Sequence, residues 1–137
     1  MQRASKILSA ARKWVGTPYV HQRREIGIGV DCIQFVIAVG VEVGAVKNIG
    51  IDKYRLLNSP TKIREYLEQY GEKLEKPKLG CVVYWGSRIN LPTHFGILSE
   101  LHEKPAIIHA DYEVGKVVEH NIPEENMVLI DSYWWFK

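Results

Sequence analysis

The sequence predicts an α+β fold, with helices in the first half of the chain and an antiparallel sheet in the second half. Helical patterns occupy the region before Gly71, and short segments rich in β-branched and aromatic residues follow it, separated by turn-forming residues. Helices that precede strands favour α+β over alternating α/β architecture. The chain has 137 residues without internal repeats or linkers, so we expect one domain spanning 1–137.

The first and third predicted helices are marked by their ends. Residues 3–15 place apolar side chains at helical spacing opposite basic ones, and Gly16 follows as a C-cap residue. Ser59 and Pro60 supply an N-cap and a first-turn proline, so the third helix is expected to run from them to Gly71. The remaining segments are expected as a loop over 21–30 and strands over 80–85, 93–99, 106–110, 116–120 and 127–133.

Composition excludes several classes of protein. Hydrophobic residues make up 46% of the chain and charged residues 25%, as in ordinary globular domains. The net charge of +2 is too small to indicate nucleic-acid binding. The N-terminal residues carry charges throughout and lack the apolar core of a signal peptide, and no stretch is apolar enough to span a bilayer. We therefore expect a protein made in the cytoplasm, with no membrane span and no nucleic-acid partner.

The second predicted helix presents a cysteine at its first position. Asp31 is a good N-cap, and Gln34 three residues later completes a variant of the capping box, so the helix is expected to begin at Cys32. The residues that follow are apolar nearly all round, which predicts a buried central helix. The Cys32 sulfur would lie beside free backbone N–H groups, which lowers a thiol pKa and favours the thiolate. Position alone leaves open an ordinary buried cysteine at a helix start.

The second cysteine, Cys81, lies in a different context. It occupies the middle of an apolar strand pattern, with no helix terminus or basic residue beside it in sequence. A buried and unreactive thiol is the better interpretation. Neither cysteine forms a CxxC pair, so the two do not indicate a disulfide framework.

A cysteine nucleophile needs a base and a group that orients the base. His94 and His109 each lie beside a turn in a predicted strand, where a side chain can face a cleft, although structural histidines are common in such places. A zinc site formed by Cys32, His94 and His109 stays open as an alternative, although no pair has the short spacing of structural zinc ligands. The other histidines fall in polar, loop-like contexts and are interpreted as structural: His21, His102 and His120.

Four segments in this order resemble the NlpC-type family of cell-wall cysteine peptidases. They are Ala11 to Tyr19, Val30 to Cys32, His94 to Ile97, and Ile108 to Ala110. More narrowly, the chain resembles the branch found among tail proteins of phages and gene transfer agents, although the stretch from Gly16 to Arg23 lacks the usual glycine near its end. The resemblance covers about the whole chain, and its specificity comes from the order and spacing of segments that are weak when taken singly.

The resemblance implies a papain-like α+β fold and a set of site residues. Cys32 would be the nucleophile at the start of a buried central helix packed on an antiparallel sheet, His94 the general base, and His109 the residue that orients His94. The Tyr19 hydroxyl and the backbone N–H of Cys32 would bind the oxyanion. Asp31 would support the site as helix N-cap. The family uses no metal or organic cofactor, and none is expected here.

The resemblance also implies a substrate. Family members cut the peptide stems of peptidoglycan, commonly the bond from γ-D-glutamyl to diaminopimelate, so we expect the stem as partner and action at the cell wall. Phage-like tail proteins are expected as possible partners, with the enzyme acting in a tail or after release. Two departures are a Gly80-Cys81 pair where members often have Gly-Asp, and the lack of a wall-binding module. A silent structural tail component and a related cysteine amidase or acyltransferase remain alternatives.

Overall fold

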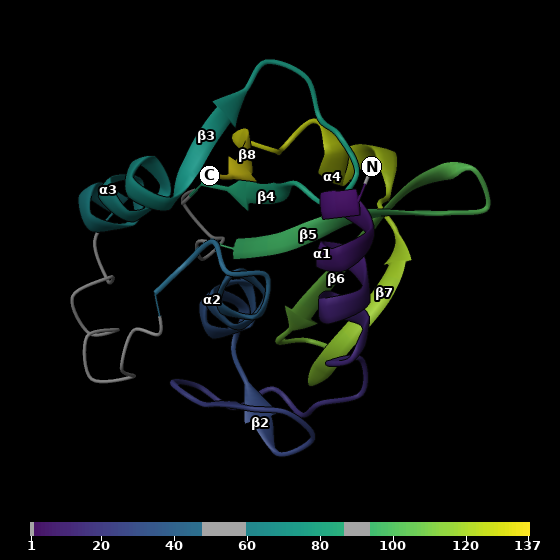
Figure 1. Ribbon diagram of the computed structural model, residues 1–137. Helices are drawn as coiled ribbons and strands as arrows, with labels where there is room; N and C mark the ends of the chain where they lie inside the picture. The colour runs from purple at the N-terminus through teal and green to yellow at the C-terminus, as the bar shows by residue number, and fades with distance from the viewer. Residues whose placement is uncertain (1, 48–59, 87–93) are drawn as a thin grey trace.

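The computed structural model describes residues 2–47, 60–86 and 94–137, with the backbone alone for 60–63. Figure 1 shows helices packed against an antiparallel sheet, which confirms the predicted α+β fold. In chain order the elements are α1 (Gln2–Arg12), β1 (Arg24–Glu25), β2 (Gly29–Val30), α2 (Cys32–Glu42), α3 (Pro60–Tyr70), β3 (Gly71–Leu74), β4 (Val82–Trp85), β5 (His94–Leu101), β6 (Lys104–Asp111), β7 (Lys116–Asn121), α4 (Glu124–Met127) and β8 (Ser132–Phe136).

The main sheet, within the described residues, has six strands in the order β3-β8-β4-β5-β6-β7, and all neighbours are antiparallel. Strands β4 to β7 follow one another as a meander. His102 and Glu103 form the two-residue turn between β5 and β6, and both have the positive φ angles, 56° and 61°, of a tight hairpin turn. Strand β8 returns from the far end of the chain and pairs between β3 and β4.

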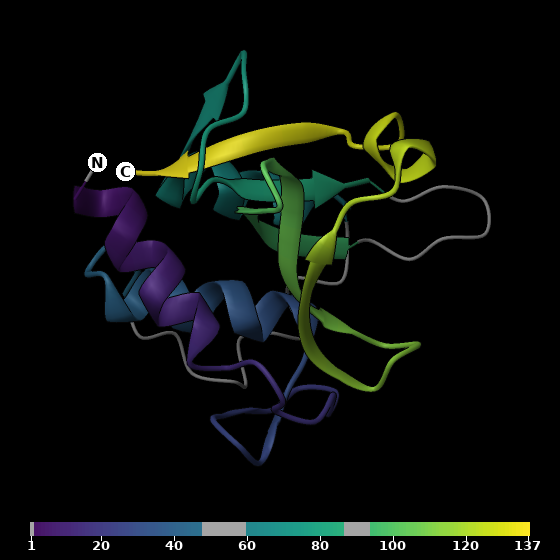
Figure 2. The same ribbon diagram turned by 90° about the vertical axis from the view of Figure 1, so that its right-hand side faces the viewer.

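The two faces of the sheet carry separate hydrophobic clusters. Both α1 and α2 lie against one face (Figures 1 and 2), where Phe35 of α2 is fully buried against Phe95 and Ile97 of β5. We call this cluster the helix-side core. Burial of a side chain such as Phe35 contributes about 2 kcal/mol. Because side chains alternate along a strand, Leu98 points to the other face. There it joins the second core, whose buried members are Cys81, Val83, Leu98, Ile107 and Ile122.

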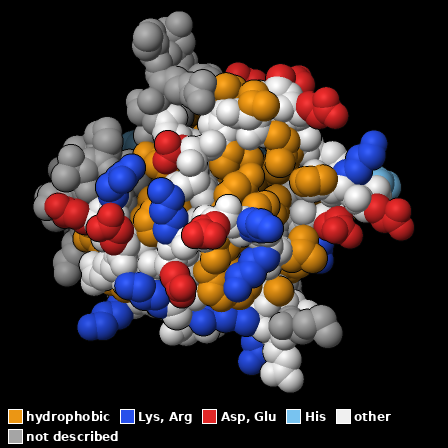
Figure 3. Space-filling view, turned by 90° about the horizontal axis from the view of Figure 1, so that it is seen from above, with side chains coloured by type: hydrophobic (Ala, Val, Ile, Leu, Met, Phe, Trp, Pro, Cys, Tyr) orange, Lys and Arg blue, Asp and Glu red, His pale blue; other side chains and the backbone are white. Residues whose placement is uncertain are grey.

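The second face is only partly covered. Figure 3, viewed from the side of β3 and β8, shows a band of hydrophobic side chains framed by lysines, arginines and acids. Trp135 of β8 belongs partly to this cluster, and the Lys78 ammonium lies 3.9 Å from the centre of its ring. None of the helices in the described ranges combines the length and apolar character needed to cross a membrane.

Helix α2 begins as predicted, with Asp31 as N-cap. Asp31 Oδ1 accepts a hydrogen bond of 2.8 Å from the Gln34 backbone N–H. The other half of the expected capping box is not formed, because Gln34 Oε1 is buried without a hydrogen-bond partner among the described residues. Gly40 allows Phe136 to approach the helix, since a Cβ at this position would come within 2.9 Å of the Phe136 ring. Packing therefore holds a helix whose β-branched residues have modest intrinsic propensity.

Several predicted boundaries are wrong. Helix α1 ends at Arg12 rather than at residue 15, and the expected loop over 21–30 contains the β1–β2 hairpin. The strand expected over 127–133 is instead the end of α4 followed by β8, which starts at Ser132. The N-cap expected at Ser59 lies outside the described residues, as does residue 93 of the strand that became β5.

The segment 16–19 runs along the free edge of β7. Gly16, with a φ of 93°, turns the chain after α1 and donates a 2.9 Å hydrogen bond to the Val117 carbonyl. The Val117 N–H donates to the Thr17 carbonyl at 2.9 Å, and the Tyr19 N–H donates to the Gly115 carbonyl at 2.8 Å. Tyr19 also bridges to Val30. The segment therefore connects the small hairpin to the main sheet.

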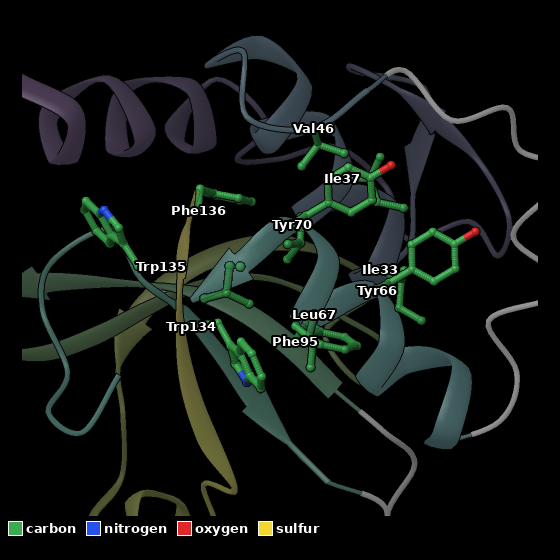
Figure 4. Close-up of a pocket in the computed structure, with 13 residues that line it drawn as sticks. Ile33, Ile37, Val46, Tyr66, Leu67, Tyr70, Phe95, Trp134, Trp135 and Phe136 are labelled. Atoms are coloured by element: carbon green, nitrogen blue, oxygen red, sulfur yellow. The ribbon is translucent and has the colours of Figure 1, made fainter. Parts of the chain in front are cut away.

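A small apolar hollow opens between α2, α3 and β8 on the helix side. Figure 4 shows Ile33, Leu67 and Trp134 among the side chains that face it. Its volume is about 80 Å³. The lining is hydrocarbon and aromatic, apart from the tyrosine hydroxyls and tryptophan N–H groups, and contains no histidine, cysteine or charged side chain.

Candidate active site

Cys32 is the first residue of α2 and belongs to the helix-side core. The residue is 7% exposed. The backbone N–H groups of Phe95, Ile33 and Cys32 itself lie close enough to the thiol to lower its pKa. The Phe95 contact places the sulfur beside the backbone of the residue that follows His94.

The expectation of a lowered thiol pKa is wrong. Burial raises the pKa of Cys32 to about 12, and the negative charge of Asp31 acts in the same direction. The backbone N–H groups at the helix start lower the pKa, but their effect is smaller. Burial also lowers the pKa of His94 to about 4, against a weaker opposing effect of Asp111. At neutral pH, therefore, both the thiol and the imidazole are uncharged.

His94 and His109 are brought together by neighbouring strands. His94 begins β5, His109 lies near the end of β6, and His94 Nε2 is 2.6 Å from His109 Nδ1. Burial lowers the pKa of His109, and the charges of His94 and His120 lower it further. Gly96 makes room for this pair, because a Cβ there would lie 2.5 Å from the Ile107 side chain and 3.1 Å from His109 Cβ.

Strands β5 and β6 are unpaired at the ends that carry His94 and His109, and we call this unpaired stretch the strand opening. The two strands pair from Leu101 and Lys104 only as far as Ile97 and Ile108, although both continue beyond these residues. The Phe95 side chain enters the helix-side core with Cys32, whereas the His94 ring points to the other face, beside Trp85 at 5.6 Å between ring centres. Phe95, whose backbone N–H acts on the thiol, thus directly follows His94 in the stretch where the strands are unpaired.

A third histidine extends this cluster. His109 Nε2 is 2.9 Å from His120 Nε2, and His120 Nδ1 is 2.8 Å from the Asn121 carbonyl oxygen. Asp111 Oδ2 lies 3.7 Å from His109 Nε2, beyond hydrogen-bond distance. His120 lies in β7, as the strand predicted over 116–120 placed it, so only the description of its context as loop-like is wrong. The available signal was its place in the predicted strand after His109, since a short turn between the two strands brings both to one face.

These histidines border a hollow on the second face of the sheet. Its volume is about 360 Å³, larger than that of the apolar hollow. His94 and His109 line it together with Trp85 and Asp111, whereas Cys32 does not.

Tyr19 and Asp31 both lie near the thiol. Burial raises the pKa of Tyr19, and the charges of Cys32 and Asp31 raise it further, so the hydroxyl stays protonated at neutral pH. The Tyr19 ring packs edge-on against Tyr112, with 5.5 Å between ring centres. Asp31 is fully buried, and besides capping α2 it accepts a 2.7 Å hydrogen bond from the Gln22 N–H through Oδ2. Asp31 therefore fixes the loop after Tyr19 to the helix that carries Cys32.

The zinc site left open by the sequence is not formed. Among the described histidines, cysteines and acids, the ligand atoms of His109, Asp111 and His120 all lie within 4.8 Å of one another. The set of Cys32, His94 and His109 does not meet this distance. Within the described ranges, the group that meets this distance therefore excludes the thiol.

Comparison with known proteins identifies solved structures of the same fold, whereas no protein-family model and no curated protein matches the chain. The NlpC/p60 domain of the peptidoglycan hydrolase SagA is 24% identical, with a TM-score of 0.65 over 97% of this chain and 98% of that domain. An NLP/P60-family lipoprotein-like protein from Staphylococcus aureus is 15% identical over 98% of this chain and 41% of its own, with a TM-score of 0.65. An N-acetylmuramoyl-L-alanine amidase from Bacteroides uniformis is 16% identical over 100% of both chains, with a TM-score of 0.61. The chain therefore has the papain-like α+β fold of NlpC/p60 domains.

Proposed function

We propose that the chain is a cysteine peptidase that hydrolyses the peptide stems of bacterial peptidoglycan. The observation that carries this proposal is the hydrogen-bonded pair of His94 and His109 at the strand opening, directly beside the residue whose backbone contacts the Cys32 thiol. In this proposal Cys32 is the nucleophile, His94 the base and His109 the residue that orients the base. The similar structures include a peptidoglycan hydrolase and a muramoyl-alanine amidase, which supports the cell wall as substrate.

The reaction would start from an uncharged thiol and imidazole. His94 uses Nε2 toward His109, so Nδ1 is the ring nitrogen that can accept the thiol proton. As the substrate carbonyl approaches, the Cys32 sulfur forms a bond to its carbon while the proton moves to His94 Nδ1. The proton then passes to the departing amine, leaving a thioester. Attack by water, with His94 again as base, releases the carboxylate and restores the thiol.

The tetrahedral intermediate would be stabilised by two donors. The backbone N–H of Cys32 lies at the start of α2, where helix N–H groups have no intrahelical partner. The Tyr19 hydroxyl supplies the second, because its raised pKa keeps its proton in place. Asp31 connects the loop after Tyr19 to the start of α2, because it accepts hydrogen bonds from the backbone N–H groups of Gln22 and Gln34.

The finer assignment is the bond from γ-D-glutamyl to diaminopimelate, cut without a metal or organic cofactor by an enzyme delivered in a phage-like tail. It rests on the resemblance of the segment from Gly16 to Arg23 and of the Asp31-Cys32 pair to that branch. The second candidate is an amidase that cuts between muramic acid and L-alanine, because one of the similar structures carries that description.

The test is digestion of purified peptidoglycan fragments of known stem, followed by mass spectrometry. We expect products with new γ-glutamyl carboxyl ends. A free lactyl carboxyl on muramic acid would favour the amidase. Cys32→Ala should abolish the products, while Cys81→Ala is the matched control. No product from a folded wild-type protein, on any stem tested, would contradict the proposed function and favour a silent structural component.

A further inference from the structure

The three histidines form one continuous chain of hydrogen bonds that ends on the main chain. His94 contacts His109 at 2.6 Å, His109 contacts His120 at 2.9 Å, and His120 contacts the Asn121 carbonyl oxygen at 2.8 Å. The rings alternate in orientation, with interplanar angles of 74° and 61°. Each imidazole thus uses both ring nitrogens, except His94, whose Nδ1 lies at the open end of the chain.

The Asn121 carbonyl, at the end of this chain of hydrogen bonds, determines which nitrogen of each imidazole carries the hydrogen. A carbonyl oxygen accepts and cannot donate, so His120 Nδ1 must carry a hydrogen. A neutral imidazole has one N–H, which makes His120 Nε2 an acceptor and requires the hydrogen on His109 Nε2. By the same step, His109 Nδ1 accepts and His94 Nε2 carries the hydrogen. The lone pair of His94 is then on Nδ1.

We propose that His120 is a positioning residue: anchored on the Asn121 carbonyl, it sets the tautomer of His109 and, through it, that of His94. This inference rests on the proposed function, in which His94 Nδ1 accepts the thiol proton. In the opposite tautomer His94 Nδ1 would carry a hydrogen and could not act as a base. The chain of hydrogen bonds therefore keeps His94 in the tautomer that can accept a proton before the substrate binds.

The structure holds both ends of this chain in place. The pairing of β6 with β7 sets His120 opposite Ile107 and His109 opposite Val118, so the two histidines are diagonal neighbours on one face. The Asn121 side chain donates a 2.8 Å hydrogen bond to the Leu101 carbonyl at the end of β5. The carbonyl that anchors His120 is therefore part of a tied strand end rather than a free loop.

Asp111 is the competing partner for His109. Its Oδ2 is 3.7 Å from His109 Nε2, against 2.9 Å for His120 Nε2. The shorter contact is a hydrogen bond and the longer one is not. His120, rather than the carboxylate, is therefore the acceptor that fixes the His109 hydrogen.

The direct test is the tautomer of each ring, read from long-range ¹H–¹⁵N correlations of the wild-type protein near pH 7. We expect the hydrogen on Nδ1 of His120 and on Nε2 of both His109 and His94. A hydrogen on His120 Nε2, or a mixture of tautomers at His94, would overturn the inference. This readout requires no turnover.

Substitutions at His120 separate positioning from simple packing. His120→Gln retains an acceptor for His109 and a donor for the carbonyl, so it should keep the tautomers and most of kcat. His120→Phe removes both, and kcat should fall about 10- to 100-fold with little change in KM, the range typical of orienting partners. His120→Lys can only donate, so it should force the opposite tautomer at His109. Its kcat should be lower than that of His120→Phe. His102→Asn on the exposed β5–β6 turn is the control and should match wild type.

The outcomes distinguish this inference from the proposed function. If the wild type cuts stems and the Gln, Phe and Lys variants lose kcat equally, the His120 role is wrong and the proposed function stands. If the wild type cuts no stem while the expected tautomers are present, the proposed function fails and the tautomer assignment stands. If a chelator removes activity and zinc restores it, a cation held by His109, Asp111 and His120 replaces the hydrogen-bond chain, and the inference is overturned.

Discussion

The two cysteines lie on opposite faces of the same sheet, and their surroundings differ more than their acidity. Cys32 belongs to the helix-side core and Cys81 to the second core. Burial raises both pKa values, to about 12 for Cys32 and about 11 for Cys81. Burial therefore leaves neither thiol acidic, and the thiol pKa does not distinguish the two residues.

What separates the two thiols is their neighbours. Cys32 lies at a helix start, with Tyr19 nearby and the His94 backbone one residue from its Phe95 contact. Cys81 is fully buried and belongs with Leu98 to the second core. Under the proposed function, Cys32 is therefore distinguished from Cys81 by the histidine beside its Phe95 contact rather than by a depressed thiol pKa.

The largest expected effect is on catalysis. Cys32→Ala should reduce kcat on a peptide-stem substrate by at least about a thousandfold, because it removes the attacking atom. Cys81→Ala should keep kcat near wild type and lower the free energy of unfolding by about 1 kcal/mol, from lost packing. Equal losses of activity in the two variants, both shown to be folded by circular dichroism, would end the distinction between the cysteines.

The next effect is on stability in acid. The folded-state pKa of His94, about 4, lies below its unfolded value of 6.5, so the unfolded state binds more protons between these two pH values. Stability should therefore fall as pH decreases from 6.5 toward 4, and His94 alone would contribute about 3 kcal/mol to that loss. Urea unfolding at pH 7, 5.5 and 4 measures it. His94→Gln should flatten the dependence, and an unchanged slope would contradict the assigned cause.

A smaller effect concerns the buried cap of α2. Asp31 accepts hydrogen bonds from the Gln34 and Gln22 N–H groups, so Asp31→Ala leaves two backbone donors without this partner. The free energy of unfolding should fall by about 2 kcal/mol. Glu25→Ala is the control, because Glu25 is exposed and its ion pair with Arg23 lies on the surface, where such a pair contributes little. Equal Tm values for these two alanine variants would refute the capping role.

The smallest effect separates the thiols by labelling. Cys32 should react with iodoacetamide about tenfold faster than Cys81, from access and the nearby base rather than from a resting thiolate. Its rate should keep rising with pH through 9, since the pKa of Cys32 is raised to about 12. Asp31→Asn keeps a capping oxygen and removes the charge that raises this pKa, so it should accelerate labelling. A rate that is flat above pH 7 would mean that the thiolate is already formed.

Local rules in the sequence were enough to predict the start of α2. An Asp N-cap and a following apolar run are neighbours in sequence, and Asp31 and Cys32 lie where the pattern placed them. Strand β3 escaped prediction because its polar residues, Gly71–Leu74, are held extended by pairing with β8. The start of β8 was misplaced for a related reason, since Pro123 and the acids after it form the short α4 turn first.

The sequence predicted the histidines of the candidate site better than it predicted the pKa of the Cys32 thiol. His94 and His109 stood out by their places beside turns. The predicted strand over 116–120 placed His120 near them, but its contact with His109 depends on the register of β7 against β6. The thiol pKa was mispredicted because a helix start was weighed without burial and without the charge of Asp31. Both are properties of the folded packing.

Residues 16–19, which we call the strap, run along β7 and also affect whether this strand can pair with another molecule. An unpaired strand edge is a template for pairing with another chain, and β7 is the last strand of its sheet. Three hydrogen bonds from the strap occupy the beginning of that edge. At the opposite side, β3 is only four residues long and presents exposed Glu72 and Lys73. Both borders are thus blunted against edge-to-edge aggregation, and the residue that ends the strap, Tyr19, also borders the candidate nucleophile.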